Sequence, residues 1–163
     1  FNEFFESLLN TYIRPMARTL FSEYISQNNK DDMNAYAFTI RYQQGEDVSL
    51  EEHSDASLYT LNVNLNLPQE DYQGSSLFFV DEHGEKTNVT LKPGEALLHL
   101  GMTRHASLPI QGGSRINMVV WLYGQDGTVR IAPYEPHERL TSRQRWSVLN
   151  DKNEKQDMFE FEL

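Results

Sequence analysis

The sequence predicts a mainly β domain that begins with one amphipathic helix. Over the first part of the chain, apolar residues recur at spacings of three and four, which is the period of a helix with one buried face. From Ala35 onward the period becomes two, and short apolar runs alternate with turn residues. Many short strands behind a leading helix are typical of a two-layered fold. We therefore expect a double-stranded β-helix, or jelly roll, with the N-terminal helix packed on it.

The length of 163 residues fits a single domain with a core of its own. We expect a helical support over residues 1–34, a jelly-roll core over 35–134 and a C-terminal extension over 135–163. The extension mixes charged and apolar residues, so it either caps the barrel or docks on a neighbour. Because the chain begins at Phe1, we expect a processed chain or an excised domain, and the sequence predicts no compartment and no oligomeric state.

The helix is expected from Phe1 to about Gln27, with a bend or a restart at Pro15. Residues from Pro68 to Gly74 are expected to form a loop. The expected strands, in chain order, are Tyr36 to Tyr42, Leu58 to Leu67, Leu77 to Val80, Thr87 to Leu91, Ala96 to Leu100, Arg115 to Tyr123 and a short Thr128 to Ile131.

Two of these strands alternate so that one face is wholly apolar. The apolar faces consist of Tyr59, Leu61, Val63, Leu65 and Leu67 in one strand and of Ile116, Met118, Val120 and Leu122 in the other. The opposite face of the first strand consists of Thr60, Asn62, Asn64 and Asn66. We expect the apolar faces to share one sheet and to pack on the N-terminal helix, while the polar faces look into the barrel.

The charge and composition exclude several classes of partner. A formal net charge of −10 disfavours binding to nucleic acid, which requires basic side chains opposite the phosphates. Arg139, Arg143 and Arg145 cluster near the end, but a solvated helical face explains them better than a nucleic-acid site. The chain has no cysteine, so it has neither disulfides nor thiolate metal ligands. No apolar run approaches the length of a membrane span.

Three residues form a candidate metal site. His53 and Asp55 are two apart at the end of an extended segment, so their side chains project to the same side of the backbone, and His105 would return from a distant strand. Two imidazoles and one carboxylate can hold Fe(II) on one face of its octahedron and leave the other positions free. A lone His-x-Asp pair is common by chance, so the prediction depends on the residues that follow.

Arg115 lies ten residues beyond His105, at the head of an apolar strand. A guanidinium embedded there needs a carboxylate, and no acidic residue is near it in sequence. Its planar fork fits a carboxylate with two hydrogen bonds, so a small dicarboxylic acid held by its far end would satisfy it. The near end of the same acid could then chelate the iron.

The stretch from Arg41 to Tyr123 resembles the Fe(II)- and 2-oxoglutarate-dependent dioxygenases, particularly the prolyl and lysyl hydroxylase branch and the 2-oxoglutarate and iron-dependent oxygenase domain proteins. The matching segments are His53-Ser-Asp-Ala-Ser-Leu-Tyr-Thr-Leu-Asn-Val-Asn-Leu-Asn66 and Pro93-Gly-Glu-Ala-Leu-Leu-His-Leu-Gly-Met-Thr-Arg-His105, followed by Gly112-Gly-Ser-Arg115. The resemblance implies that His53, Asp55 and His105 are iron ligands and that Arg115 binds the tail carboxylate of 2-oxoglutarate.

The resemblance also suggests further residues of the cosubstrate pocket. Tyr42 is similar to a tyrosine that contacts 2-oxoglutarate in prolyl hydroxylases, although its spacing to His53 is longer, and an ordinary core tyrosine is the alternative. Thr60 and Asn62 match residues of the lysyl-hydroxylase-like segment and could donate to the cosubstrate carboxylates, or they could face solvent. Trp121, on the same face as Arg115, either walls the pocket or is a core tryptophan.

His99 is a rival for the second metal histidine. The next arginine within a strand lies sixteen residues after it rather than ten, and His99 itself sits within an apolar strand. We therefore interpret it as a packed, hydrogen-bonded histidine of the core or one that supports the ligands, rather than as a ligand.

The predicted function is that of an oxygenase. The resemblance implies Fe(II), 2-oxoglutarate and O2, with ascorbate as a further candidate cofactor, and hydroxylation of a C–H bond with succinate and CO2 as co-products. A peptidyl proline or lysine is the favoured substrate, and small molecules remain open. Two alternatives are a non-catalytic jelly-roll binding module and a cupin-like metalloenzyme that does not use 2-oxoglutarate.

Overall fold

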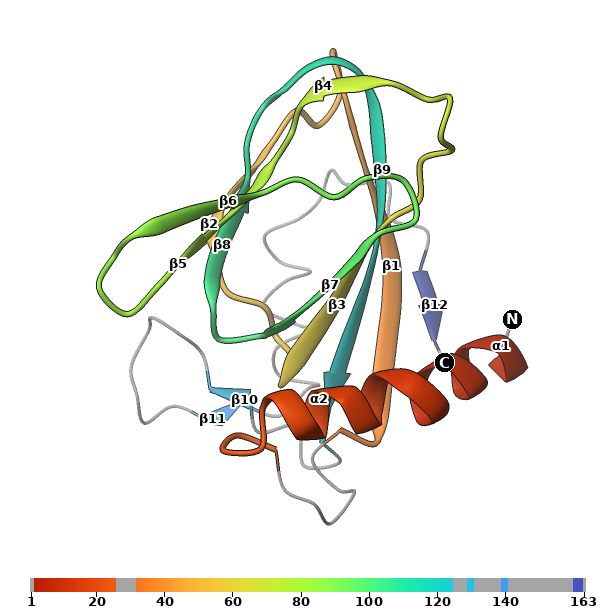
Figure 1. Ribbon diagram of the computed structural model, residues 1–163, viewed down its shortest axis with the longest axis vertical. Coiled ribbons are helices and arrows are strands. Elements are labelled where there is room, and N and C mark those ends of the chain that lie inside the picture. The colour runs from red at the N-terminus through yellow and green to blue at the C-terminus, as the bar shows by residue number, and fades with distance from the viewer. Residues whose placement is uncertain (1, 26–31, 125–128, 131–138, 141–159, 163) are drawn as a thin grey trace.

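The computed structural model describes residues 2–25, 32–124, 129–130, 139–140 and 160–162, and most of its strands form two antiparallel sheets (Figure 1). The larger sheet has the order β12-β1-β9-β3-β7, with β4 also paired to β9, and contains β1 (Asn34–Gln43), β3 (Tyr59–Asn64), β4 (Tyr72–Gly74), β7 (Ala96–Leu100), β9 (Ile110–Tyr123) and β12 (Glu160–Glu162). The smaller sheet has the order β2-β8-β5-β6 and contains β2 (Leu50–His53), β5 (Leu77–Val80), β6 (Lys86–Val89) and β8 (Arg104–Ser107). A separate pair joins β10 (Val129–Arg130) to β11 (Arg139–Leu140).

The chain passes repeatedly between the two sheets, from β1 in the larger to β2 in the smaller and back to β3, and again from β7 to β8 to β9. This winding is that of a jelly roll, so the predicted fold class is confirmed. None of the helices in the described ranges has the length and apolar character needed to cross a bilayer.

The N-terminal helix consists of α1 (Asn2–Leu8), a π-helical turn η1 (Leu9–Ile13) and α2 (Arg14–Leu20). The bend expected at Pro15 is observed as the π-helical turn η1, which lies just before this residue. The wider turn lets the helix continue past proline, which cannot donate a backbone hydrogen bond. The expected end near Gln27 is wrong. Phe21 leaves the helical conformation at φ −118°, and the apolar period persists beyond it only because Ile25 is buried in the following turn.

The main hydrophobic core lies between this helix and the outer face of the larger sheet, where the helix crosses the lower end of the strands in Figure 1. It contains Leu9, Ile13, Ala17, Ile25, Ala37, Tyr59, Leu61, Val120 and Leu122. The expected packing of the apolar faces on the helix is therefore confirmed. The apolar face of β3 is shorter than expected, because the strand ends at Asn64 and Leu65 and Leu67 are exposed.

A buried carboxylate joins the helix to the sheet. Asp32 is fully buried and accepts hydrogen bonds from Arg18 Nη2 at 2.6 Å and from the Tyr59 hydroxyl at 2.8 Å. Burial, reinforced by the carboxylate of Asp32, raises the pKa of Tyr59, so the phenol stays a donor. The apolar contact between helix and sheet is thus fixed in register by one polar anchor.

The stretch from Pro68 to Gly74 is not entirely a loop, because β4 pairs with β9 (Tyr72↔Gly113, Gln73↔Gly112). β9 begins at Ile110, earlier than expected, because Gly112 and Gly113 belong to the strand. A side chain at Gly113 would collide with the backbone of Asp71, so the close approach of the two strands requires glycine there.

The C-terminal segment is described only in part. β12 adds to the edge of β1 (Ala37↔Phe161), and Arg139 lies in the short strand β11, not in the expected helical face. Arg143 and Arg145 lie outside the described residues, as do both ends of the expected Thr128 to Ile131 strand, of which Val129–Arg130 is present as β10. The division of the chain at residues 34 and 134 stays a prediction.

Candidate metal centre and carboxylate pocket

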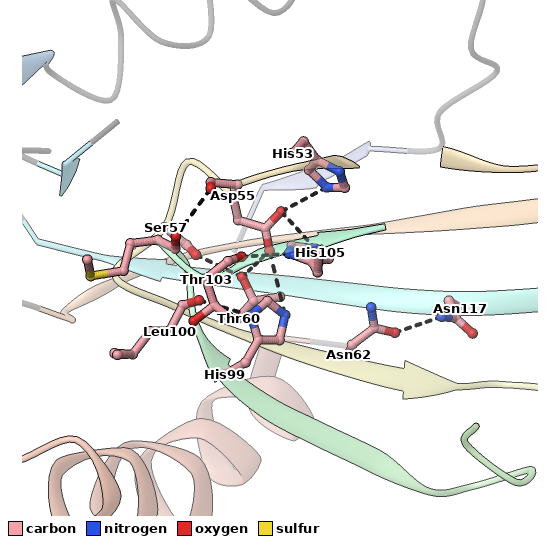
Figure 2. Close-up of polar contacts among 12 residues, drawn as sticks. His53, Asp55, Ser57, Thr60, Asn62, His99, Leu100, Thr103, His105 and Asn117 are labelled. Atoms are coloured by element: carbon pink, nitrogen blue, oxygen red, sulfur yellow. Dashed lines mark hydrogen bonds and ion pairs between the residues drawn. The ribbon is translucent and has the colours of Figure 1, made fainter. Parts of the chain in front are cut away.

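The histidines of the candidate metal site sit on two adjacent strands of the smaller sheet. His53 ends β2 and His105 lies in β8, and the two residues are direct cross-strand partners, with ring centroids 4.4 Å apart. Asp55 follows β2 by two residues, in the segment that crosses to the larger sheet. Figure 2 shows both imidazoles turned toward its carboxylate. Strand pairing thus brings together residues that are far apart in sequence.

The ligand atoms are close enough to share one ion. Asp55 Oδ1 lies 3.4 Å from His53 Nε2 and 3.7 Å from His105 Nε2, and one atom from each residue falls within 4.8 Å of the others. Ligands about 2.1 Å from an ion and at right angles to one another lie about 3 Å apart. The set of two imidazoles and one carboxylate therefore fits a divalent iron after small movements of the side chains.

Both imidazoles are held in the tautomer that a metal requires. Nδ1 of His53 lies 2.7 Å from the carbonyl oxygen of Glu51, and Nδ1 of His105 lies 2.9 Å from that of Thr103. A carbonyl oxygen can only accept, so each Nδ1 carries a proton, and Nε2, which faces Asp55, is the ring nitrogen left to bind a metal. Burial lowers the pKa of His105 to about 4, which keeps this imidazole neutral at neutral pH.

The carboxylate of Asp55 is oriented in the same way. Its Oδ2 accepts a hydrogen bond of 2.6 Å from Thr60 Oγ1, and Thr60 in turn is 2.8 Å from Ser57 Oγ (Figure 2). Because the Thr60 proton goes to the carboxylate, Ser57 donates to Thr60. Burial alone would raise the pKa of Asp55, but hydrogen bonding from His53 and the neighbouring histidines lower it to about 2. The carboxylate therefore stays ionised, and Oδ1, which faces both histidines, can bind a cation together with them.

The segments that carry the ligands are joined by hydrogen bonds to backbone carbonyl groups, two donated by backbone N–H groups and one by a side chain. The Asp55 N–H donates to the Gly101 carbonyl at 2.8 Å, the Gly101 N–H donates to the Leu58 carbonyl at 3.0 Å, and Ser54 Oγ donates to the Met102 carbonyl at 3.2 Å. A side chain at position 101 would overlap the carbonyl of Ser57, so only glycine permits this approach. The relative position of Asp55 and His105 is therefore set by the backbone.

Arg115 lies on β9, directly opposite Tyr42 on β1, and is only 4% exposed. Its guanidinium carbon stands 4.9 Å from the centre of the Tyr42 ring, and its Nε and Nη2 are buried without a hydrogen-bond partner. Burial lowers the pKa of Arg115, and within the described part of the chain no carboxylate forms an ion pair with it. A buried cation with two free donors is strongly unfavourable unless a ligand supplies the anion.

The remaining predicted pocket residues are distributed along the inner face of the larger sheet. Tyr42 lies beside Arg115. Thr60 binds Asp55, so the proton of its hydroxyl is already committed to that carboxylate. Asn62 Oδ1 accepts a 2.7 Å hydrogen bond from Asn117 Nδ2. Trp121 pairs with Thr60 across the strands, and its ring packs edge-on against Phe38 at 5.2 Å. Trp121 thus lies nearer the metal end of the sheet than the Arg115 end.

His99 lies beside the ligand set without joining it. Its Nε2 is 3.8 Å from Asp55 Oδ2, the oxygen that Thr60 already occupies, and its ring is 4.7 Å from that of His105. Nδ1 lies 3.0 Å from the Leu100 carbonyl, and Nε2 is buried without a hydrogen-bond partner. The side chain therefore packs behind Asp55, on the side away from Oδ1.

Several lining residues were not predicted. Asn117 lies on the same face of β9 as Arg115, where strand periodicity placed it without giving it a role in the site. Ser107 stands two residues after His105 on β8, so the same periodicity could have indicated it. Phe79 stacks on the His105 ring at 5.3 Å and could have been found from the same alternation. Ser75 is fully buried at a corner of the chain, and no sequence signal indicates it.

Comparison with known proteins agrees with this arrangement. The chain is 32% identical over 136 residues to a 2-oxoglutarate and iron-dependent oxygenase domain-containing protein of Danio rerio, covering 80% of this chain and 38% of the relative. It is 38% identical over 114 residues to a multifunctional procollagen lysine hydroxylase and glycosyltransferase of Rattus norvegicus, covering 69% of this chain and 15% of that protein. No family model matches the chain.

Among solved structures, a prolyl 4-hydroxylase from Phytophthora capsici has the same fold, with a TM-score of 0.55 at 16% identity over 85% of this chain and 47% of the other. The fold and the candidate metal centre together define the class as a jelly-roll protein whose side chains could form a 2-His-1-carboxylate site. The sequence similarity narrows this class, and the chain belongs to the Fe(II)- and 2-oxoglutarate-dependent oxygenase superfamily. It spans little more than a third of the length of the Danio rerio relative.

Proposed function

We propose that this domain is a 2-oxoglutarate-dependent dioxygenase that hydroxylates a C–H bond. One observation carries the proposal: a preoriented His–Asp–His set and a buried guanidinium with unpaired donors share one barrel. His53, Asp55 and His105 would hold Fe(II), and Arg115 would bind the tail carboxylate of 2-oxoglutarate. When bound, iron with 2-oxoglutarate and O2 supplies an oxidant that hydroxylates the substrate and leaves succinate and CO2.

The protein's own contribution is orientation and exclusion of water. The carbonyl groups of Glu51 and Thr103 hold the imidazoles, and Thr60 holds one oxygen of Asp55 so that the other faces the ion. Phe79 covers the ring of His105. His53 has the most exposed side chain of the three ligands, at 31% against 4% and 6%, so we infer that the substrate approaches from its side.

The substrate we propose is a peptidyl lysine or proline. The support is the similarity to proteins named as procollagen lysine hydroxylases. Incubation with a peptide library, followed by mass-spectrometric detection of one added oxygen atom, tests this. Modification of a free metabolite, with no modified peptide, would contradict it.

Anaerobic binding followed by exposure to O2 tests the activity. The protein should bind Fe(II), then bind 2-oxoglutarate only when the metal is present, and should release succinate when O2 is admitted. Binding of metal without any effect of 2-oxoglutarate would instead support a cupin-like metalloenzyme. Absence of metal binding would support a non-catalytic module. Addition of ascorbate should increase the succinate formed over repeated turnovers if it is a cofactor.

Arg41→Ala provides a matched control for Arg115→Ala in this assay. Arg41 is on the same strand pair but is exposed and paired with Glu46 at 2.8 Å. The Arg41→Ala variant should bind 2-oxoglutarate as tightly as the unmodified protein, whereas the Arg115→Ala variant should bind it more weakly.

A further inference from the structure

One buried residue stands in a backbone conformation that side chains rarely adopt. Within the described ranges, Ser75 is the one non-glycine residue with a positive φ, at 55°, and it is fully buried. Gly74 before it has φ 77°. Glycine would occupy the left-handed region at Ser75 without crowding its Cβ against the backbone. A serine in this conformation therefore points to a role for its hydroxyl group.

The corner that contains Ser75 is fixed against the segment after β8. The Ser75 N–H donates to the Pro109 carbonyl at 3.1 Å, and the Leu108 N–H donates to the Ser76 carbonyl at 2.9 Å. This pairing directs the Ser75 hydroxyl inward, to 3.4 Å from the hydroxyl of Ser107. Ser107 is itself buried, with 3% of its surface exposed.

The contact continues to the carboxylate pocket. Ser107 stands two residues after His105, on the same side of β8, and its hydroxyl faces Tyr42 on the larger sheet, where it lowers the pKa that burial of the phenol raises. Tyr42 in turn lies under the guanidinium of Arg115. Four side chains from four segments therefore form one chain of contacts that ends at the unpaired N–H groups of Arg115.

We propose that Ser75 and Ser107 are positioning residues for the pocket of the cosubstrate's tail carboxylate. Ser75 donates to Ser107, and Ser107 donates to the oxygen of Tyr42, so the Tyr42 proton is free to point at the bound ligand beside the N–H groups of Arg115. A carboxylate only accepts hydrogen bonds, so this polarity suits it. The proposal rests on the proposed function, because the ligand is the tail carboxylate of 2-oxoglutarate.

Titration of 2-oxoglutarate into protein loaded with Mn(II), which does not turn over, tests the proposal by calorimetry. We expect Ser107→Ala to weaken binding about five-fold and Ser75→Ala or Ser75→Gly about three-fold, the range expected for loss of one neutral hydrogen bond. Ser76→Ala is the matched control, since Ser76 is the adjacent residue and its hydroxyl contacts Thr90 instead, so its affinity should not change.

Stability separates positioning from a merely structural role. Ser75→Gly relieves the positive φ and should raise the melting temperature by roughly 3 °C while it weakens 2-oxoglutarate binding. If Ser75 served only to stabilise the fold, Ser75→Gly would change the melting temperature and the affinity for 2-oxoglutarate in the same direction. In addition, 2-oxovalerate, which has a methyl group in place of the tail carboxylate, should bind equally to the unmodified protein and to every serine variant.

Unchanged 2-oxoglutarate affinity in Ser75→Gly and Ser107→Ala, with tight binding by the unmodified protein, would overturn the positioning role alone. Equal weakening for 2-oxoglutarate and 2-oxovalerate would also overturn it. Failure of the unmodified Mn(II) protein to bind 2-oxoglutarate would overturn the proposed function together with this inference.

Discussion

The two ends of the candidate site differ in how completely the protein satisfies its own polar groups. At the metal end, Nδ1 of His53, Nδ1 of His105 and Oδ2 of Asp55 each have a hydrogen-bond partner, which leaves the ligand atoms free to face one another. At the other end, Arg115 is equally buried but has two donors without partners. The metal end is thus preorganised by the protein, whereas the arginine end is complete only with an anionic ligand.

The largest effect should come from removing a metal ligand. His105→Ala should lower the affinity for Fe(II) by at least about 100-fold, because one of three ligands is lost. His99→Ala should change it by less than about three-fold, since His99 lies behind the oxygen that Thr60 occupies. Anaerobic equilibrium dialysis measures both. The exposed His83 offers a matched control, and reversed outcomes for positions 99 and 105 would show that the ligand assignment is wrong.

Arg115→Met should separate the two ends of the site. Loss of a charged hydrogen bond to the tail carboxylate should raise the dissociation constant for 2-oxoglutarate roughly 30-fold, or about 2 kcal/mol, with little change in Fe(II) affinity. Without ligand, the melting temperature should stay the same or rise, because an unpaired buried cation has been replaced by an apolar side chain. Calorimetry measures the dissociation constant and thermal denaturation measures the melting temperature, with Arg41→Met as a control at an exposed arginine.

An equal loss of metal and 2-oxoglutarate affinity in Arg115→Met would indicate a structural arginine. A marked fall in the melting temperature of the ligand-free protein would indicate that the guanidinium is satisfied by the protein after all.

A smaller effect should come from loosening the metal end without removing a ligand. Thr60→Val keeps the shape of the side chain but removes the hydroxyl that holds Asp55 Oδ2, and Fe(II) affinity should fall about ten-fold. Thr60→Ser, which keeps the hydroxyl, should bind Fe(II) nearly as well as the unmodified protein. If Thr60→Val binds 2-oxoglutarate poorly but Fe(II) normally, Thr60 contacts the cosubstrate, as the sequence resemblance suggested.

Sequence periodicity was sufficient to predict the packing of strands that bury only one face. The alternation in β3 and β9 predicted the core beneath the helix, because a strand with one apolar face has only one way to bury it. Periodicity was insufficient to find the start of β9, where two glycines continue the strand. Consecutive glycines are common in turns, and only the pairing with β4 shows that Gly112 and Gly113 belong to the sheet. The helix end was misplaced because Ile25 is buried from a turn, which keeps the helical spacing without the helix.

For the site, the sequence indicated which residues could bind a metal but not which groups orient them. Thr60 was expected at the cosubstrate because it matches a residue of the lysyl-hydroxylase-like segment, whereas its hydrogen bond to Asp55 depends on how the chain crosses from the smaller sheet to the larger one. The positive φ of Ser75 has no signature in a residue type that normally avoids it. Contacts of this kind follow from the tertiary arrangement, which local spacing does not encode.

The hydrogen bonds between the first ligand segment and the turn at Gly101 bear on how the domain behaves when iron is scarce. Ser54 and Met102 are 48 residues apart, yet they are held together by the polypeptide alone. We expect a ligand set held in this way to keep its shape when the ion is lost. Starvation for iron would then silence the domain without exposing its core to proteases, and resupply would restore it without new synthesis.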